Sequence, residues 1–203
     1  ALINIDNLIA ATATLSTQGV GASITLDNTG ALVLNSAVAT GGGAISVIAL
    51  SPLTVAGDVL TAGNNGITLT ATDDGGDNDT LGINANVTIR SEQGDISLTA
   101  GENITQATGG LIETGGNGTI SIQADQDADD GSGAFTQAGD AEVRHLGAGT
   151  IDVDARVNVA VTNILGTSET TVSLTSETAA ITDVDAGAGL DIRGGALTLT
   201  AVT

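Results

Sequence analysis

Along most of the chain, apolar and polar residues alternate in short runs, and each run ends at glycine, asparagine or another small residue. In the run 94–100, for example, Ile96 and Leu98 alternate with Ser97 and Thr99. Successive side chains of a β-strand point to opposite faces, so an apolar period of two predicts strands with one buried face. A helix would need a period of 3.6, and glycines interrupt every run before a helix could reach a useful length.

One phrase recurs through the chain: a small residue, alternating aliphatic and polar positions, and then alanine or a small polar residue. Its copies follow one another at intervals of about 21 to 31 residues, which is the range of solenoid repeats. The copies lie at 21–26, 43–47, 66–71, 94–100, 118–124, 149–155, 171–175 and 195–201. No single repeat could bury its aliphatic face alone, so we expect the repeats to stack.

Two further strands are expected within each repeat. A second phrase begins at Leu53, Ile104, Phe135 and Ile181, and a third, shorter one occupies 87–90, 111–114 and 142–146. Three strands and three corners rich in glycine or asparagine make one triangular coil. We therefore predict an all-β fold, a right-handed parallel β-helix (β-solenoid) of about eight to nine coils, built by residues 1–203 as one segment.

The composition favours this fold over an antiparallel β-sandwich. The chain contains no Trp, Tyr, Met or Cys, and Phe135 is its only aromatic residue. A sandwich core needs large side chains to fill the space between two sheets, whereas stacked aliphatic residues fill the narrow interior of a β-helix. The 29 glycines suit tight corners.

Both ends of the predicted rod are expected to be open. Residues 1–5 and 197–203 are themselves strand-like, and neither has the pattern of an amphipathic cap. An uncovered apolar coil recruits another chain. The expected partners are therefore neighbouring coils of the same protein or identical subunits stacked end to end.

The formal charge of −20, from 24 acidic residues against four arginines, restricts the other partners. Nucleic acids and anionic membrane surfaces are disfavoured because both require clustered cations. No run is long and apolar enough to insert directly into a membrane. Divalent cations are expected partners, because carboxylates crowded on a narrow rod repel one another unless they are screened or bridged.

Two acidic inserts follow the first strand of their repeats, at 73–79 and 125–133. In the second, aspartates at alternating positions followed by glycine resemble the start of a calcium loop, although Thr136 occupies the twelfth position, where a bidentate glutamate is usual. The inserts would lie about 10 Å apart on one edge if the corners align. Solvated acidic loops without metal are the alternative. The candidate calcium ligands are Asp73, Asp74, Asp77, Asp79, Asp125, Asp127, Asp129 and Asp130.

Other kinds of chemistry find less support in the residues. A polysaccharide lyase needs a cationic base, but the chain has no lysine and its arginines are spread over different repeats. Pairs such as Thr68 with Thr70 could order water on an ice-binding face, yet the equivalent positions elsewhere are mixed. We expect His145 to be an exposed strand residue and not a catalytic base. The chain is thus not expected to be an enzyme.

The phrases at 94–101, 104–107 and 118–124 resemble the repeat regions of filamentous-haemagglutinin-like large exoproteins and related giant bacterial adhesins. This resemblance implies an extracellular or surface-attached rod, and it supplies no catalytic residues. Two functions follow as expectations. The first is a structural rod, as an adhesin stalk or filament subunit, and the alternative is an adhesive module that binds a glycan or a protein.

Overall fold

The computed structural model describes residues 2–9, 11–76, 78–125, 133–185 and 191–202. Strands fill most of this length, and every strand pair in the described part of the chain is parallel. An antiparallel sandwich is therefore excluded. Among the described residues, no helix is long and apolar enough to span a membrane.

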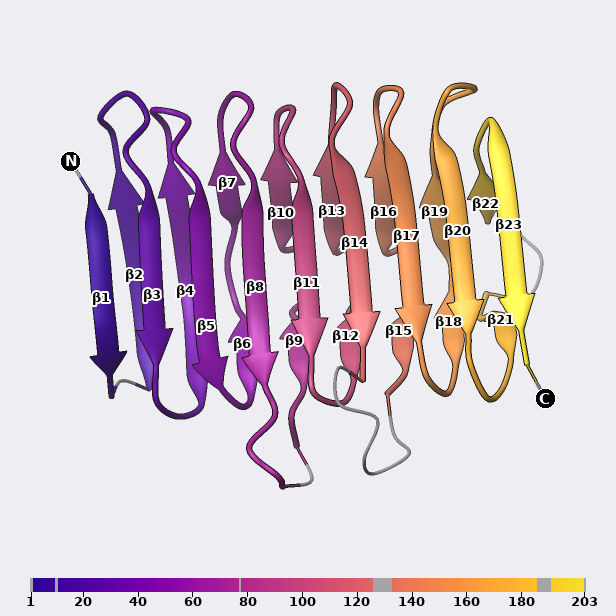
Figure 1. Cartoon of the computed structure of the whole chain (residues 1–203), viewed down its shortest axis with the longest axis horizontal. Helices are drawn as coiled ribbons and strands as arrows, with labels where there is room; N and C mark the ends of the chain where they lie inside the picture. Colours follow the sequence, from indigo (N-terminus) through magenta and orange to yellow (C-terminus); the bar gives the residue numbers. More distant parts are fainter. Residues whose placement is uncertain (1, 10, 77, 126–132, 186–190, 203) are drawn as a thin grey trace.

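The front sheet collects the first strand of each coil (Figure 1). Its strands, in order along the rod, are β1 (Ile3–Leu8), β3 (Ile24–Asn28), β5 (Ile45–Leu50), β8 (Ile67–Thr72), β11 (Ile96–Ala100), β14 (Thr119–Ala124), β17 (Thr150–Ala155), β20 (Thr171–Ser176) and β23 (Ala196–Ala201). All of these strands except β1 coincide with copies of the recurring phrase of the sequence, so the predicted repeat is confirmed.

The back sheet has two rows of strands, which the long strand β4 (Leu32–Ala39) joins. The lower row contains β2 (Thr12–Thr17), β4, β6 (Leu53–Val55), β9 (Leu81–Ile83), β12 (Ile104–Gln106), β15 (Phe135–Gln137), β18 (Val159–Val161) and β21 (Ile181–Asp183). The upper row continues from β4 with β7 (Val59–Thr61), β10 (Thr88–Ser91), β13 (Leu111–Thr114), β16 (Glu142–His145), β19 (Asn163–Leu165) and β22 (Ile192–Arg193).

We number the coils from the amino terminus: coil 1 is β1–β2, coil 2 is β3–β4, and coils 3 to 8 begin at β5, β8, β11, β14, β17 and β20. Strand β23 opens a ninth coil. Coils 3 to 8 each contain the three strands that the sequence predicted, whereas coils 1 and 2 contain two. In Figure 1 the front strands run downward, the chain returns upward behind them, and the coils advance from left to right, which makes the solenoid right-handed.

The core is the interior of the stacked coils, here called the lumen. Aliphatic side chains at equivalent positions of successive coils fill it, stacked in rows, or files, that run along the rod. Ile45 pairs with Ile67, Ile67 with Ile96, and Ile96 with Ile120, all at equivalent positions of neighbouring coils. Each of these side chains is at most 1% exposed. Phe135, the single ring, is fully buried between Ile104 and Val159 in register. The fold thus stacks like on like, as the alternation predicts.

Corner glycines allow the coils to approach closely. A Cβ atom on Gly43 would collide with the carbonyl group of Ala22 in the coil before it. Gly42 and Gly63 have positive φ angles of 77° and 75°, a region that favours glycine. Glycine at Gly43 therefore permits the coil spacing of about 4.8 Å that the hydrogen bonds between stacked parallel strands impose.

Candidate functional site

The first acidic insert brings three carboxylates together where the chain leaves β8. Carboxylate oxygens of Asp73, Asp74 and Asp79 all lie within 4.8 Å of one another. Asp74 is exposed, whereas Asp79 is only 2% exposed. Three of the predicted calcium ligands thus form a cluster, and Asp77 lies outside the described residues.

Local hydrogen bonds give this insert its shape. The Gly75 N–H donates to Asp73 Oδ1 at 2.7 Å, and the Gly76 N–H donates to Asp74 Oδ1 at 3.0 Å. Such short side-chain to main-chain bonds are typical of aspartate turns. The main-chain oxygen of Asp79 accepts the Glu102 N–H at 2.9 Å, which ties the end of the insert to coil 5.

The electrostatics of the cluster favour a cation. Burial raises the pKa of the Asp79 carboxyl, and its hydrogen bond with Asp73 and the charge of Asp74 add to the increase. A hydrogen bond from Ser51 and the N–H of Asp74 act in the opposite direction. Carboxylate oxygens are the preferred ligands of hard divalent ions, whose charge offsets this repulsion. The cluster can hold a metal ion.

A second cluster, which sequence reasoning missed, lies in coil 8. Carboxylate oxygens of Asp183, Asp185 and Asp191 also lie within 4.8 Å of one another. Burial raises the pKa of Asp191, followed by the charges of Asp183 and Asp185. Asp191 Oδ1 is buried and makes no hydrogen bond within the described part of the chain. The only sequence signal was the Asp-Val-Asp spacing at 183–185, because the fold brings in Asp191 from a separate position.

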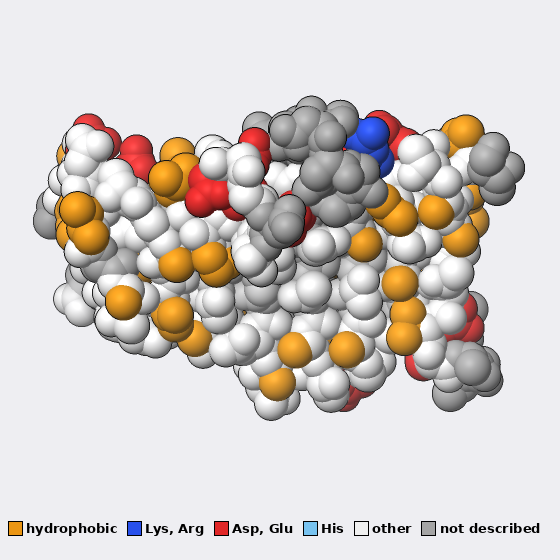
Figure 2. Space-filling view, turned by 90° about the horizontal axis from the view of Figure 1, so that it is seen from below, with side chains coloured by type: hydrophobic (Ala, Val, Ile, Leu, Met, Phe, Trp, Pro, Cys, Tyr) orange, Lys and Arg blue, Asp and Glu red, His pale blue; other side chains and the backbone are white. Residues whose placement is uncertain are grey.

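The second predicted insert has a different arrangement at its start. Asp125 follows β14 with a φ angle of 71°, and its fully buried side chain accepts a hydrogen bond from Arg156 Nη1 at 3.3 Å. An arginine of coil 7 therefore neutralises this carboxylate. Asp127, Asp129 and Asp130 lie outside the described residues. The strands that lead into the two inserts, β8 and β14, both end at the lower edge of the rod, with β11 of coil 5 between them (Figure 1). Figure 2 looks onto this edge and shows acidic side chains gathered on it.

The prediction for His145 was wrong, because its side chain points into the lumen and is 1% exposed. Its Nε2 lies 2.6 Å from the Gly118 carbonyl oxygen, and its Nδ1 accepts the Gly147 N–H at 3.0 Å. These partners require the neutral ring with the proton on Nε2. Leu146, on the other side of the strand, is the exposed residue.

His145 belongs to a file of buried polar residues at the upper corners. Thr61, Ser91, Thr114 and His145 are in register at the ends of β7, β10, β13 and β16. Each bonds to a main-chain oxygen at the corner before it; the Ser91 and Thr114 hydroxyls, for example, donate to Asn65 O and Gly94 O. Repeats of one bond type at one corner indicate a structural role.

Three of the four arginines, although spread over different repeats, align in the fold. Arg90, Arg144 and Arg193 occupy one outward position of the upper row, in coils 4, 6 and 8. Glu113 lies between the first two and is buried, with oxygens 3.1 Å from Arg90 Nε and 2.7 Å from Arg144 Nε. A carboxylate between two guanidinium groups is a charge-assisted network.

Comparison with protein-family models, with curated proteins and with solved structures finds no match to this chain. The fold itself defines a β-solenoid protein, with two acidic clusters that could hold a metal ion.

Proposed function

We propose that the chain is a structural rod of a bacterial extracellular surface protein, serving as an adhesin stalk or filament subunit. The continuous filled lumen supports this proposal most strongly, since the two aliphatic files of the front sheet run without interruption from coil 2 to coil 7. Such a rod resists bending because ladders of hydrogen bonds join the strands of neighbouring coils in both sheets. The extracellular location follows from the resemblance to large exoproteins and from the acidity.

Exposed leucines in the last coil support association of the rod at its end. Leu197 and Leu199 continue the files of Val172 and Leu174, yet they are 50% and 51% exposed. Another coil stacked on β23 would cover them and pair the free edge of the strand. We propose that this coil belongs either to the same protein or to an identical subunit placed end to end.

Electron microscopy of concentrated protein tests end-to-end stacking. We expect fibres of the width of one coil, and we expect the double change L197D/L199D to abolish them. The matched control is I48D, because Ile48 is 37% exposed on the side of the front sheet and not on an end. Single particles at every concentration, or fibres that survive L197D/L199D, would contradict stacking.

We also propose that calcium binds the cluster of Asp73, Asp74 and Asp79 and stabilises the rod. The supporting observations are three converging carboxylates and the raised pKa of Asp79, which a bound cation would lower. A ligand that binds only the folded state raises the melting temperature, and the increase grows with the logarithm of the ligand concentration above the dissociation constant. Melting with calcium and with a chelator should therefore give different midpoints.

The variant D74N should reduce the calcium-dependent shift, since Asp74 is an exposed member of the cluster. D140N is the matched control, as Asp140 is an exposed corner aspartate of the same sign outside both clusters. Equal midpoints with calcium and chelator would rule out a stabilising calcium site.

A further inference from the structure

Two asparagine–glycine pairs lie at upper corners of the rod, where the chain turns from the back sheet into the front sheet (Figure 1). Asn65 and Gly66 lead from β7 into β8, and Asn117 and Gly118 lead from β13 into β14. No other asparagine of the sequence precedes a glycine. In such a pair the main-chain nitrogen of glycine attacks the asparagine side chain more readily than elsewhere, because glycine has no side chain in the way.

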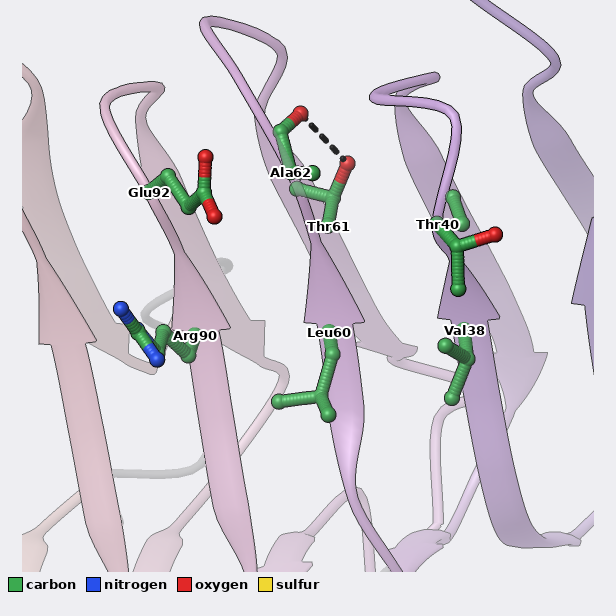
Figure 3. Close-up of a pocket in the computed structure, with 8 residues that line it drawn as sticks. Val38, Thr40, Leu60, Thr61, Ala62, Arg90 and Glu92 are labelled. Atoms are coloured by element: carbon green, nitrogen blue, oxygen red, sulfur yellow. Dashed lines mark hydrogen bonds between the residues drawn. The ribbon is translucent and has the colours of Figure 1, made fainter. Parts of the chain in front are cut away.

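The corner that carries Asn65 is tied to the corners on both sides of it. Asn65 Nδ2 donates a hydrogen bond to the Gly42 carbonyl oxygen in the preceding corner. On the other side, the Gly63 N–H donates to Glu92 Oε2 at 3.0 Å. Figure 3 shows Glu92 beside Ala62, the residue at which the corner begins. The Asn65 amide would have to give up its hydrogen bond before it could react.

The Asn117 side chain, by contrast, is not engaged. It is exposed, and its amide makes no hydrogen bond with any residue that the structure describes. The Gly118 N–H, whose nitrogen would attack, donates only a long bond of 3.4 Å to the Gly115 carbonyl oxygen. A hydrogen bond of that length is weak. Both groups that take part in the reaction are therefore available at this corner.

Water reaches the same corner. Asn117 and Gly118 line a polar hollow of about 330 Å³ together with Gln93 and Asp95 of the preceding corner. Gly118 itself is buried, but the side chains of Gln93, Asp95 and Asn117 around it are exposed. Hydroxide can therefore take the proton of the Gly118 nitrogen, and water can supply the oxygen that a hydrolysis step needs.

We propose that Asn117 is a site of spontaneous deamidation. The Gly118 nitrogen loses its proton to hydroxide and attacks Asn117 Cγ, and the new bond between them expels Nδ2 as ammonia. Water then opens the resulting succinimide ring. Opening at Cγ gives aspartate, whereas opening at the main-chain carbonyl carbon gives isoaspartate, which has one more CH₂ group in the main chain. The net reaction consumes one water and releases one ammonia, and nothing is oxidised or reduced.

Either product disturbs the corner. The new carboxylate lies in the same hollow as Asp95, and like charges repel. Isoaspartate also lengthens the main chain next to Gly118, whose carbonyl oxygen lies 2.6 Å from Nε2 of the buried His145. Little room exists for this, since even a Cβ atom on Gly118 would lie 2.6 Å from the Gly94 carbonyl oxygen. Deamidation should therefore loosen the contact between this corner and its neighbours.

Peptide mapping by mass spectrometry, after incubation in mildly alkaline water labelled with ¹⁸O, tests the site. Cleavage at arginine places Asn65 in 1–90 and Asn117 in 91–144. In the folded protein we expect Asn117 to take up label about fivefold faster than Asn65, which is the effect of one ordinary hydrogen bond. In urea the two rates should become similar. Equal rates in the folded protein, or an unchanged ratio in urea, would overturn the proposal.

Variants test the consequence for the rod. N117Q should remove the fast reaction, because glutamine would have to close a larger ring, and the matched control N65Q should leave it unchanged. After incubation the parent should melt at a lower temperature than before, whereas N117Q should not change. N117D introduces the carboxylate without lengthening the main chain, so it should melt above the incubated parent. Fast labelling that persists in N117Q, or an incubated parent with an unchanged melting temperature, would contradict the proposal.

Discussion

Gln137 lies next to Gln106 in the lumen, one coil further along the rod. Its Nε2 donates a hydrogen bond to Gln106 Oε1 at 3.0 Å. Both amides are buried where the lower row of the back sheet bends into the upper row. Gln106 donates onward to the Gly110 oxygen, and Gln137 Oε1 accepts the Thr162 N–H at 2.9 Å. The two glutamine side chains therefore hydrogen-bond main-chain N–H and carbonyl groups at a bend where the strands form no hydrogen bonds with one another.

Replacing Gln137 with leucine should destabilise the rod. Q137L removes the acceptor for the Thr162 N–H and leaves that buried donor without a partner, at a cost of about 2–3 kcal/mol. Urea unfolding followed by circular dichroism measures the change. The control Q123L changes an exposed glutamine of the front sheet and should lie near the parent. Equal stability of both variants would show that the amides in the lumen make no net contribution to the free energy of unfolding.

The corner glycines should tolerate a methyl group only where the coils leave space. G43A places a Cβ against the Ala22 carbonyl, so we expect a loss of about 2 kcal/mol or more. G30A meets nothing within 4 Å and has no positive φ angle, so its stability should stay close to the parent. Thermal melting measures the melting temperatures of the two variants and of the parent. A G43A melting point at or above that of G30A would contradict the close approach.

Threonine, which occupies the equivalent position in two other coils, should preserve part of the stability that His145 provides. H145A loses the bonds to Gly118 and Gly147, and we expect it to cost about 2–4 kcal/mol through unpaired groups and a cavity. H145T restores a hydroxyl at the position equivalent to Thr114, so it should recover part of this loss. Chemical denaturation would show the order. If H145T is no more stable than H145A, the corner hydrogen bond is not what stabilises the position.

Asp154 should make stability depend on pH. It faces outward on β17, and burial raises the pKa of its carboxyl, with the charges of Glu177 and Asp152 adding to the increase. Oδ1 is buried without a hydrogen-bond partner in the described chain. A carboxyl with a raised folded-state pKa destabilises the fold where it is ionised, and this penalty disappears as the pH falls through the raised pKa.

We therefore expect D154N to raise the melting temperature at pH 7, and the advantage to shrink as the pH approaches 4. D140N, at an exposed corner, should show no comparable change. Melting curves across this pH range measure both. A D154N advantage that grows toward acid pH would have the wrong sign for this explanation.

Much of the fold could be predicted because its information is local. The alternation of apolar and polar residues in 94–100 alone predicts β11, and its copies predict the other front strands. The short strands were harder to find: β9 and β18 contain three residues each, too few for a period to stand out. They become strands because Leu81 and Val159 stack on the neighbouring coils.

The candidate site was predicted only in part, for the same reason. Asp73, Asp74 and Asp79 are close in sequence, and their convergence could be expected. The approach of Asp191 to Asp183 and the pairing of Asp125 with Arg156 depend on the path of the chain around the coil. Sequence separation says little about such contacts.

The sequence by itself determined the strands, the stacked coil, the aliphatic lumen and the acidic character, because each depends on residue type and a period of two. Only the tertiary structure decided which residues of different coils lie side by side. Coil lengths vary from about 21 to 31 residues, so register is fixed by side-chain stacking in the lumen and not by distance along the chain. That stacking placed His145 inside the rod and aligned Arg90, Arg144 and Arg193 on its surface.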